Sequence, residues 1–172
     1  MMTETLHLRR PLPQHAETVA GWVWDDRELF WLAPGTERPL TAEKVLAWTR
    51  NRGNPFLLCA GDEDTPIGYA ELNPLRNRRT HLWVGHFILA PVRRGRGHGV
   101  SFARLLLDRA FNGLGADLVS LIVFPNNHRA IRCYLNAGFK LREEQHHKFG
   151  RPAKSYRMLH LVSARPAPAE AH

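Results

Sequence analysis

The chain has 172 residues, of which 44% are hydrophobic and 23% charged, a size and composition that suit one globular domain and leave no room for a second. Its formal net charge of +8 is typical of proteins that bind an anionic ligand, an acidic partner or RNA, and does not choose among them. The chain has only two cysteines, which argues against a disulfide scaffold. The sequence also lacks the apolar core of a signal peptide and any apolar run near the roughly 20 residues of a membrane span, which argues against secretion and membrane insertion. These observations predict a cytoplasmic protein.

The first half of the chain alternates short strand and helix patterns. Pro13 opens a helical stretch, and a second one has Thr41 as its cap and Gly53 as its stop. The expected elements are a strand at 5–12, a helix at 14–26, an aromatic-rich connection at 27–40, a helix at 41–53 and a hairpin within 55–72.

The second half begins with a basic loop at 73–79 and a long strand at 80–90. A helix at 100–111 carries its apolar residues on one face, and the apolar run at 117–124 is typical of a strand buried on both faces. A helix at 126–139, capped by Asn126 or Asn127 and stopped by Gly138, precedes a hairpin of strands at 140–149 and 154–162. We expect one α/β domain over residues 1–163 and a disordered Pro/Ala-rich tail over residues 164–172.

The sequence RGRGHG, residues 94–99, lies between the long strand and the helix at 100–111. Glycines at such a junction let backbone N–H groups converge on a ligand, and the start of a helix favours negative charge. The pattern predicts a phosphate-binding loop, although a tight turn with solvated arginines would have the same sequence.

Two motifs in order resemble those of the GNAT N-acetyltransferase superfamily. RGRGHG fits Q/R-x-x-G-x-G/A, which is similar to the loop that binds the pyrophosphate of acetyl-CoA in that superfamily. About thirty residues on, NHRAIRCYLNAGF fits N-x-x-A-x-x-x-Y-x-x-x-G-F, similar to its second cofactor motif. The resemblance extends over residues 6–162 and implies a mixed sheet of about seven mostly antiparallel strands with a splayed parallel pair, flanked by about four helices.

The resemblance also implies acetyl-CoA as cosubstrate, bound where the fourth and fifth strands splay apart. Pantetheine would pair with the fourth strand, and the glycine loop would surround the pyrophosphate. The residues expected to bind the cofactor are Phe87, Leu89, Arg94, Gly95, Arg96, Gly97, His98, Gly99, Val100 and Asn127.

The implied reaction is direct attack of a primary amine on the acetyl thioester. Tyr134 would be the general acid for the departing thiolate. Glu71 is the first candidate for the general base, followed by His81 and His86 or a water molecule. Many relatives carry a glutamate on the fourth strand, where this chain has HLWVGHF, so the base stays open. We expect no metal site, because neighbouring histidines such as His146 and His147 project to opposite faces of a strand.

The resemblance also implies that the acceptor lies over the region of the first two helices and the final hairpin. In this region tryptophans accompany Asp25, Asp26 and Glu28, and together they could hold an ammonium group. Overall basicity argues against a polycationic antibiotic, so the expected acceptor is a protein or peptide N-terminus or a small amine, and the chain a monomer or homodimer. Two alternatives are an RNA- or ribosome-binding module, although nucleic acid is the less favoured partner, and a non-catalytic acyl-CoA-binding regulator.

Overall fold

The computed structural model describes residues 4–51, 53–62 and 64–170 of the chain. The strands are β1 Leu6–Arg9, β2 Pro55–Ala60, β3 Thr65–Leu75, β4 Arg78–Leu89, β5 Leu118–Val123, β6 Lys140–Phe149 and β7 Lys154–Ala164. The helices are α1 His15–Ala20, α2 Asp26–Leu32, α3 Ala42–Trp48, α4 His98–Asp108 and α5 His128–Ala137, with a 3₁₀ turn at Pro91–Arg93 and a π turn at Arg109–Gly113.

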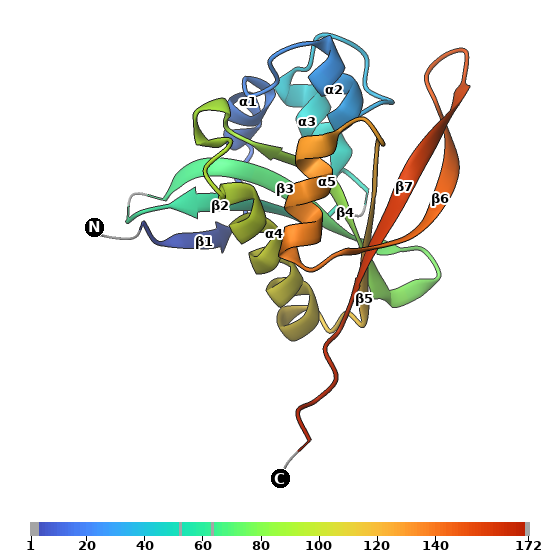
Figure 1. Ribbon diagram of the computed structural model, residues 1–172. Helices are drawn as coiled ribbons and strands as arrows, with labels where there is room; N and C mark the ends of the chain where they lie inside the picture. The colour runs from blue at the N-terminus through green and yellow to red at the C-terminus, as the bar shows by residue number, and fades with distance from the viewer. Residues whose placement is uncertain (1–3, 52, 63, 171–172) are drawn as a thin grey trace.

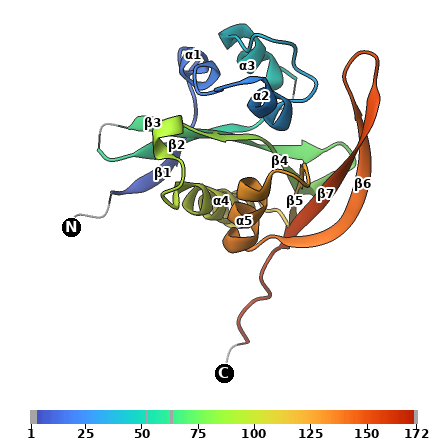
Figure 2. The same ribbon diagram turned by 45° about the horizontal axis from the view of Figure 1, so that its top comes forward.

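The strands of the described residues form one seven-stranded sheet in the order β1-β2-β3-β4-β5-β7-β6. Its neighbouring strands are antiparallel except for β4 and β5, which are parallel. Helices α1, α2 and α3 cover one face, and α4 and α5 cover the other (Figures 1 and 2). The mixed α/β fold predicted from the two motifs is confirmed.

Each face of the sheet has its own apolar core, because strand side chains alternate between faces. On the α4/α5 face, Phe102 and Leu106 of α4 pack with Leu58, Leu72 and other buried residues. On the α1–α3 face, Val19 and Val45 pack with Leu57 and Ile88. β4 contributes to both cores and is therefore fixed between the layers.

The N-terminal helices differ from the prediction. The helix expected over residues 14–26 ends at Ala20, with Gly21 as its C-cap. A separate helix, α2, then lies within the stretch expected to be a connection. It begins because the Asp25 side chain accepts a hydrogen bond from the Glu28 N–H, which satisfies one of the free amides of the first turn.

Other boundaries also change. The helix expected over residues 41–53 with Gly53 as its stop ends earlier, at Trp48 with Thr49 as its C-cap, and the strand expected over residues 5–12 is only Leu6–Arg9. The basic loop expected over residues 73–79 is a turn of two residues, because β3 extends to Leu75 and β4 begins at Arg78. The predicted tail overlaps the end of β7, and Arg165 donates hydrogen bonds to the carbonyls of Ala116 and Phe111. Its last two residues, 171 and 172, lie outside the described part of the chain. None of the helices in the described ranges has the length together with the apolarity that crossing a bilayer requires.

Candidate active site

The parallel strands β4 and β5 separate soon after they meet. They pair only at His81 with Leu118, Leu82 with Val119 and Trp83 with Ser120. Beyond these pairs β4 continues to Leu89 beside β3, while β5 continues to Val123 beside β7. The described sheet therefore has a gap, along which the β5-facing peptide groups of β4 have no strand partner and could pair with an extended ligand.

A bulge in β4 lies at this gap. The register with β3 shifts between the Tyr69–Ile88 and Glu71–Gly85 pairs, and His86 has a φ of 45°. Such a φ is uncommon for histidine and marks a local constraint. The extra residue lets the His86 side chain face α3, whereas the next side chain, Phe87, packs on the α4/α5 side.

The predicted phosphate-binding loop follows β4 directly. Gly95 and Gly97 have φ values of 73° and 84°, which favour glycine, and Gly97 caps α4. In the described residues, the N–H groups of residues 95–100 donate to no backbone carbonyl, whereas the Ser101 N–H already bonds to the Gly97 carbonyl. The loop thus presents free amides at a helix start, a suitable arrangement for an anion.

The two arginines and the histidine of the loop make different contacts. Arg94 turns inward: its guanidinium donates to the carbonyls of Leu89 and Trp22 and pairs with Glu28 at 2.6 Å. His98 Nδ1 lies 3.0 Å from the Arg93 carbonyl oxygen, and Arg96 is exposed. Arg94 therefore anchors the loop to the end of β4 and to α2, and an anion would meet the loop mainly through its amides.

The start of α4 packs closely on α5. A Cβ atom at Gly99 would lie 3.0 Å from Cys133 Sγ, so a larger residue would push the helices apart. Val100 is partly buried in the core of this face. Asn127 caps α5 by accepting a hydrogen bond from the Ala130 N–H at 3.4 Å.

Tyr134 lies on α5 beneath the gap. Its ring is buried and packs edge-on against Phe87 of β4 and Phe139, with ring centroids 5.4 and 5.9 Å apart. Among the described residues, none hydrogen-bonds its hydroxyl group. Burial, with a smaller effect of Cys133, raises the pKa of Tyr134, so the phenol keeps its proton.

Glu71 of β3 is fully buried on the opposite face of the sheet. It accepts hydrogen bonds from the Tyr69 hydroxyl at 2.9 Å and the Asn73 amide at 3.0 Å, and it lies 2.8 Å from His86 Nδ1. Burial alone would raise the pKa of Glu71, but His86, Asn73 and Tyr69 together lower it. A Cβ atom at Gly85 would lie 2.8 Å from Glu71 Oε2, so this carboxylate needs a glycine opposite it.

His86 is held on two sides. Its Nδ1 faces Glu71, and its ring stacks on Trp48 with centroids 3.9 Å apart and planes at 5°. The Trp48 Nε1–H in turn donates to Thr36 Oγ1. Within the described chain His86 Nε2 has no hydrogen-bond partner, and the side chain is 24% exposed. An imidazole oriented by a carboxylate in this way can accept a proton at Nε2.

His81, the other candidate base, lies where β4 and β5 are still paired. Its Nε2 is 2.7 Å from Ser120 Oγ, and burial, followed by the nearby charges of Arg78, His160 and Arg142, lowers its pKa. The structure brings Glu71 and His86 together and leaves His81 apart. Trp48 and Asn73 were not singled out from the sequence, although the alternation of Tyr69, Glu71 and Asn73 along a strand indicates a shared face.

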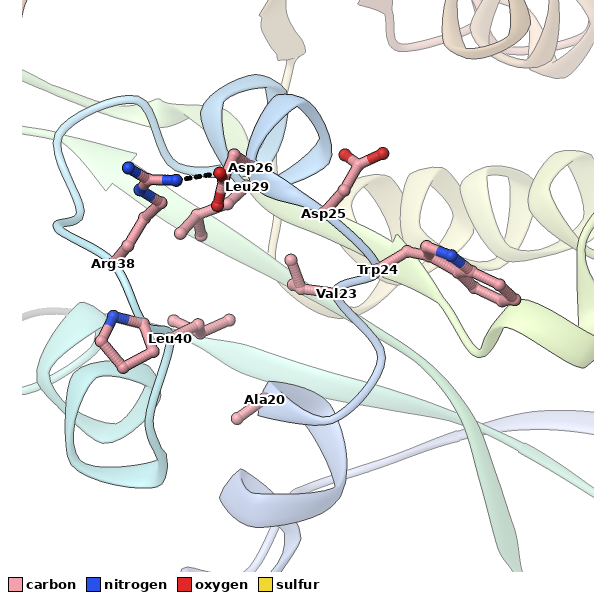
Figure 3. A pocket seen from close by; sticks show the side chains of 9 residues that line it. Ala20, Val23, Trp24, Asp25, Asp26, Leu29, Arg38 and Leu40 are labelled. Carbon is pink, nitrogen blue, oxygen red and sulfur yellow. Dashed lines mark hydrogen bonds and ion pairs between the residues drawn. The ribbon is translucent and has the colours of Figure 1, made fainter.

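The carboxylates expected to hold an ammonium group already have partners. Asp25 caps α2, Asp26 pairs with Arg38, and Glu28 pairs with Arg94. Asp26 and Arg38 border an open pocket of about 580 Å³ between α1, α2 and the segment before α3. In Figure 3 the indole of Trp24 points away from the other residues of this pocket. In the described ranges, no group of three or more His, Cys, Asp or Glu side chains is placed to hold a metal ion.

Fold and site together define the class: an α/β protein whose sheet opens at its parallel pair, beside a glycine loop that starts a helix. The chain belongs to the Acetyltransferase (GNAT) family, whose sequence pattern matches residues 17–139. The family predicted from the two motifs is thereby confirmed.

Individual proteins resemble the chain more distantly. It is 30% identical over 91 residues to spermidine N(1)-acetyltransferase of Escherichia coli strain K12, a match over 53% of this chain and 47% of that protein. The chain therefore spans about half the length of the curated relatives that it matches.

Among solved structures, the aminoglycoside acetyltransferase AAC(6')-Ib with coenzyme A has a TM-score of 0.73 at 21% identity, covering 94% of this chain and 95% of that one. Spermidine N-acetyltransferase from Vibrio cholerae, with CoA and spermine, has a TM-score of 0.74 at 17% identity, covering 92% and 95%. At these identities the likeness shows the fold alone.

Proposed function

We propose that the protein is an acetyl-CoA-dependent N-acetyltransferase that acetylates a primary amine. One observation carries this proposal: the gap between β4 and β5 has an imidazole–carboxylate pair, His86 and Glu71, on one face and a protonated phenol, Tyr134, on the other. Family membership supports it, and the relatives' names refer to amine acceptors and to CoA.

The glycine loop and the gap between β4 and β5 suit two parts of acetyl-CoA, the diphosphate and the pantetheine. The free N–H groups of residues 95–100 would hold the diphosphate. The unpaired edge of β4 near Phe87 would accept the pantetheine amides as an added strand. The inward-facing guanidinium of Arg94 already bonds to the Leu89 carbonyl, so we assign Arg94 to support of the loop.

Acetyl-CoA supplies an activated thioester. In the transfer, the amine nitrogen bonds to the acetyl carbon, the carbon–sulfur bond breaks, and the sulfur leaves with the bonding electrons. The nitrogen must lose a proton and the sulfur must gain one. The chain therefore has to provide an acceptor and a donor of protons on the two sides of the acetyl group.

We assign the proton acceptor to His86 Nε2 and make Glu71 its positioning residue. This reverses the order expected from the sequence, in which Glu71 came first. Glu71 is fully buried, and its carboxylate is engaged by Tyr69, Asn73 and His86, so a substrate cannot reach it. His86 keeps one ring nitrogen free and partly exposed, and its contact with Glu71 fixes which nitrogen that is.

We assign proton donation to Tyr134. Its raised pKa keeps the phenol protonated, and its hydroxyl is not engaged by another described residue. The contact of its ring with Phe87 places it beside the edge of β4 where the thioester would lie. A positioned general acid contributes about 10²–10⁴ in rate.

The test is release of free thiol from acetyl-CoA over a panel of primary amines. We expect turnover by the wild-type protein, a fall of about 10²-fold or more in kcat for Tyr134→Phe, and a similar fall for His86→Gln.

Calorimetric titration with CoA controls for folding and cofactor binding, and both variants should bind CoA like the wild type. Undiminished thiol release in Tyr134→Phe would remove Tyr134 from the acid role. CoA binding without turnover of any amine would instead identify an acyl-CoA-binding regulator.

A further inference from the structure

The hairpin of β6 and β7 reaches from the sheet towards α2, and an aromatic cluster joins them. This cluster, Phe30 of α2, Phe124 after β5, Phe149 of β6 and Tyr156 of β7, has ring centroids 4.9 to 6.1 Å apart. Figure 1 shows the hairpin rising beside the layer of α1–α3. The cluster lies past the end of β5 and so borders the opening of the gap on the face that carries His86.

Three cations lie on the elements that carry this aromatic cluster, α2 and the β6–β7 hairpin. Lys154 is paired with Phe149 across the hairpin and is two residues from Tyr156, so its side chain shares their face. Arg151 lies in the turn of the hairpin. Arg27 lies one helical turn before Phe30, and its guanidinium sits 4.8 Å above the Trp31 ring. All three are exposed, and none forms an ion pair with a carboxylate of the described chain.

The carboxylates of the same region are each engaged. On α2, Asp26 pairs with Arg38 and Glu28 with Arg94. On the hairpin, Glu144 pairs with Arg157, and Glu143 accepts a hydrogen bond from Gln145. Asp25 and Glu143 have no arginine or lysine partner in the described chain, but Arg27, Arg151 and Lys154 outnumber them, so the net charge beside the opening is positive.

We infer that the acceptor is a primary amine that also carries an anionic group, a carboxylate or a phosphate, which Arg27, Arg151 and Lys154 recognise beside the aromatic cluster. The inference rests on the proposed N-acetyltransferase function and defines its substrate class. Unpaired cations attract an anionic molecule and repel a second ammonium group. The amine end would then extend past the aromatic rings to His86, while the anionic end stays with the cations.

A matched set of four-carbon amines tests the inference: 4-aminobutyrate, 1-aminobutane and 1,4-diaminobutane carry a carboxylate, a methyl group and a second ammonium group at the far end. We expect kcat/KM to decrease in that order, and the same ranking for ω-amino acids and diamines of two to six carbons. Two arms identify the source of the negative charge. 2-Aminoethyl phosphate tests a phosphate, and the tetrapeptides Ala-Glu-Glu-Ala and Ala-Lys-Lys-Ala test a peptide.

Charge reversal at the hairpin should invert the preference. In Arg151→Glu/Lys154→Glu, we expect the ratio of kcat/KM for 4-aminobutyrate to that for 1,4-diaminobutane to fall by at least about fivefold for each reversed charge. Arg76→Glu, in the turn between β3 and β4, makes one such charge reversal away from the tip of the hairpin and should leave the ratio unaltered. All these variants should bind CoA like the wild type.

Binding of 4-aminobutyrate to the CoA-bound protein, measured by calorimetry, separates this inference from the proposed function. Binding that the double variant weakens, without turnover of any amine, would contradict the proposed function and support only the anion-recognition part of the inference. A wild-type preference for 1,4-diaminobutane or Ala-Lys-Lys-Ala would overturn the inference and leave the function intact. RNA binding that the double variant abolishes, without an effect on any amine, would likewise overturn it.

Discussion

Glu71 shows how one buried side chain ties the stability of the sheet to pH. His86, Asn73 and Tyr69 stabilise its charged form, so the pKa of Glu71 lies below the ordinary value for glutamate. A carboxyl group with a depressed folded pKa stabilises the fold above its unfolded pKa, and this stabilisation is lost as the pH falls through the folded pKa.

We therefore expect Glu71→Gln to lower the free energy of unfolding at neutral pH by about 1–3 kcal/mol. The difference from the wild type should shrink as the pH is lowered below the ordinary range of glutamate, because the wild-type carboxyl group also becomes neutral. Denaturant unfolding at a series of pH values measures this. Glu144→Gln, in an exposed pair with Arg157, should differ from the wild type by less than about 1 kcal/mol at every pH. A constant deficit for Glu71→Gln would contradict the expected linkage.

The pairing of Glu71 with His86 is the part of the site that sequence alone left open. Both residues were candidate bases, but their contact depends on the bulge that shifts β4 against β3 and on the positive φ of His86. Histidine rarely adopts this φ, and no local pattern in HLWVGHF marks the shift. The cross-strand register had to be known before Glu71 could be identified as the buried partner.

At the scale of the element, the start of α4 depends on Gly97. This residue is the helix cap with a φ of 84°, and a Cβ atom there would meet nothing within 4 Å. The effect of a substitution would therefore come from the backbone, which would shift the neighbouring amides.

For Gly97→Ala we expect a loss of stability of about 1–2 kcal/mol and a fall of about tenfold or more in CoA affinity, because amides that bind a charged group contribute about 1.5–3 kcal/mol each. Gly61→Ala is the matched control. Gly61 also has a positive φ, 71°, and open space around it, but it lies in the turn after β2. It should lose similar stability and keep the wild-type affinity in the same calorimetric titration. Equal CoA affinities for the two variants would rule out the amide loop as the anion site.

The sequence predicts helices α3 and α5, which have clear capping residues, and misses helix α2. The structure confirms Thr41 as the cap of α3, Asn127 rather than Asn126 as the cap of α5, and Gly138 as the stop of α5, whereas the stop predicted for α3 at Gly53 is wrong. Helix α2 has only seven residues, rich in aromatics, and its start at Asp25 follows closely on α1. Short helices depend on tertiary packing more than on intrinsic propensity. The sequence alone therefore predicts a connection where α2 lies.

At the scale of the whole molecule, the net charge of +8 should affect how the phosphates of acetyl-CoA approach. Long-range attraction of this kind is screened by salt, with a Debye length of about 10 Å at 0.1 M and about 3 Å at 1 M. We expect kcat/KM for acetyl-CoA to fall several-fold between about 50 and 500 mM NaCl, with a smaller change in kcat. S-acetylpantetheine, which has the same thioester and no phosphate, should show little salt dependence. Equal salt dependence of the two thioesters would contradict a role for net charge in binding.

The single parallel pair has a consequence for the mechanics of the sheet. Strands β1–β4 and β5–β7 form two antiparallel blocks, joined within the sheet by three residue pairs at one end of their boundary. That boundary has the fewest residue pairs of any two neighbouring strands in the described sheet, and we expect the two blocks to move relative to each other there. A ligand bound in the gap between β4 and β5 would contact both blocks. We therefore expect ligand binding to make the sheet more rigid and the fold more stable.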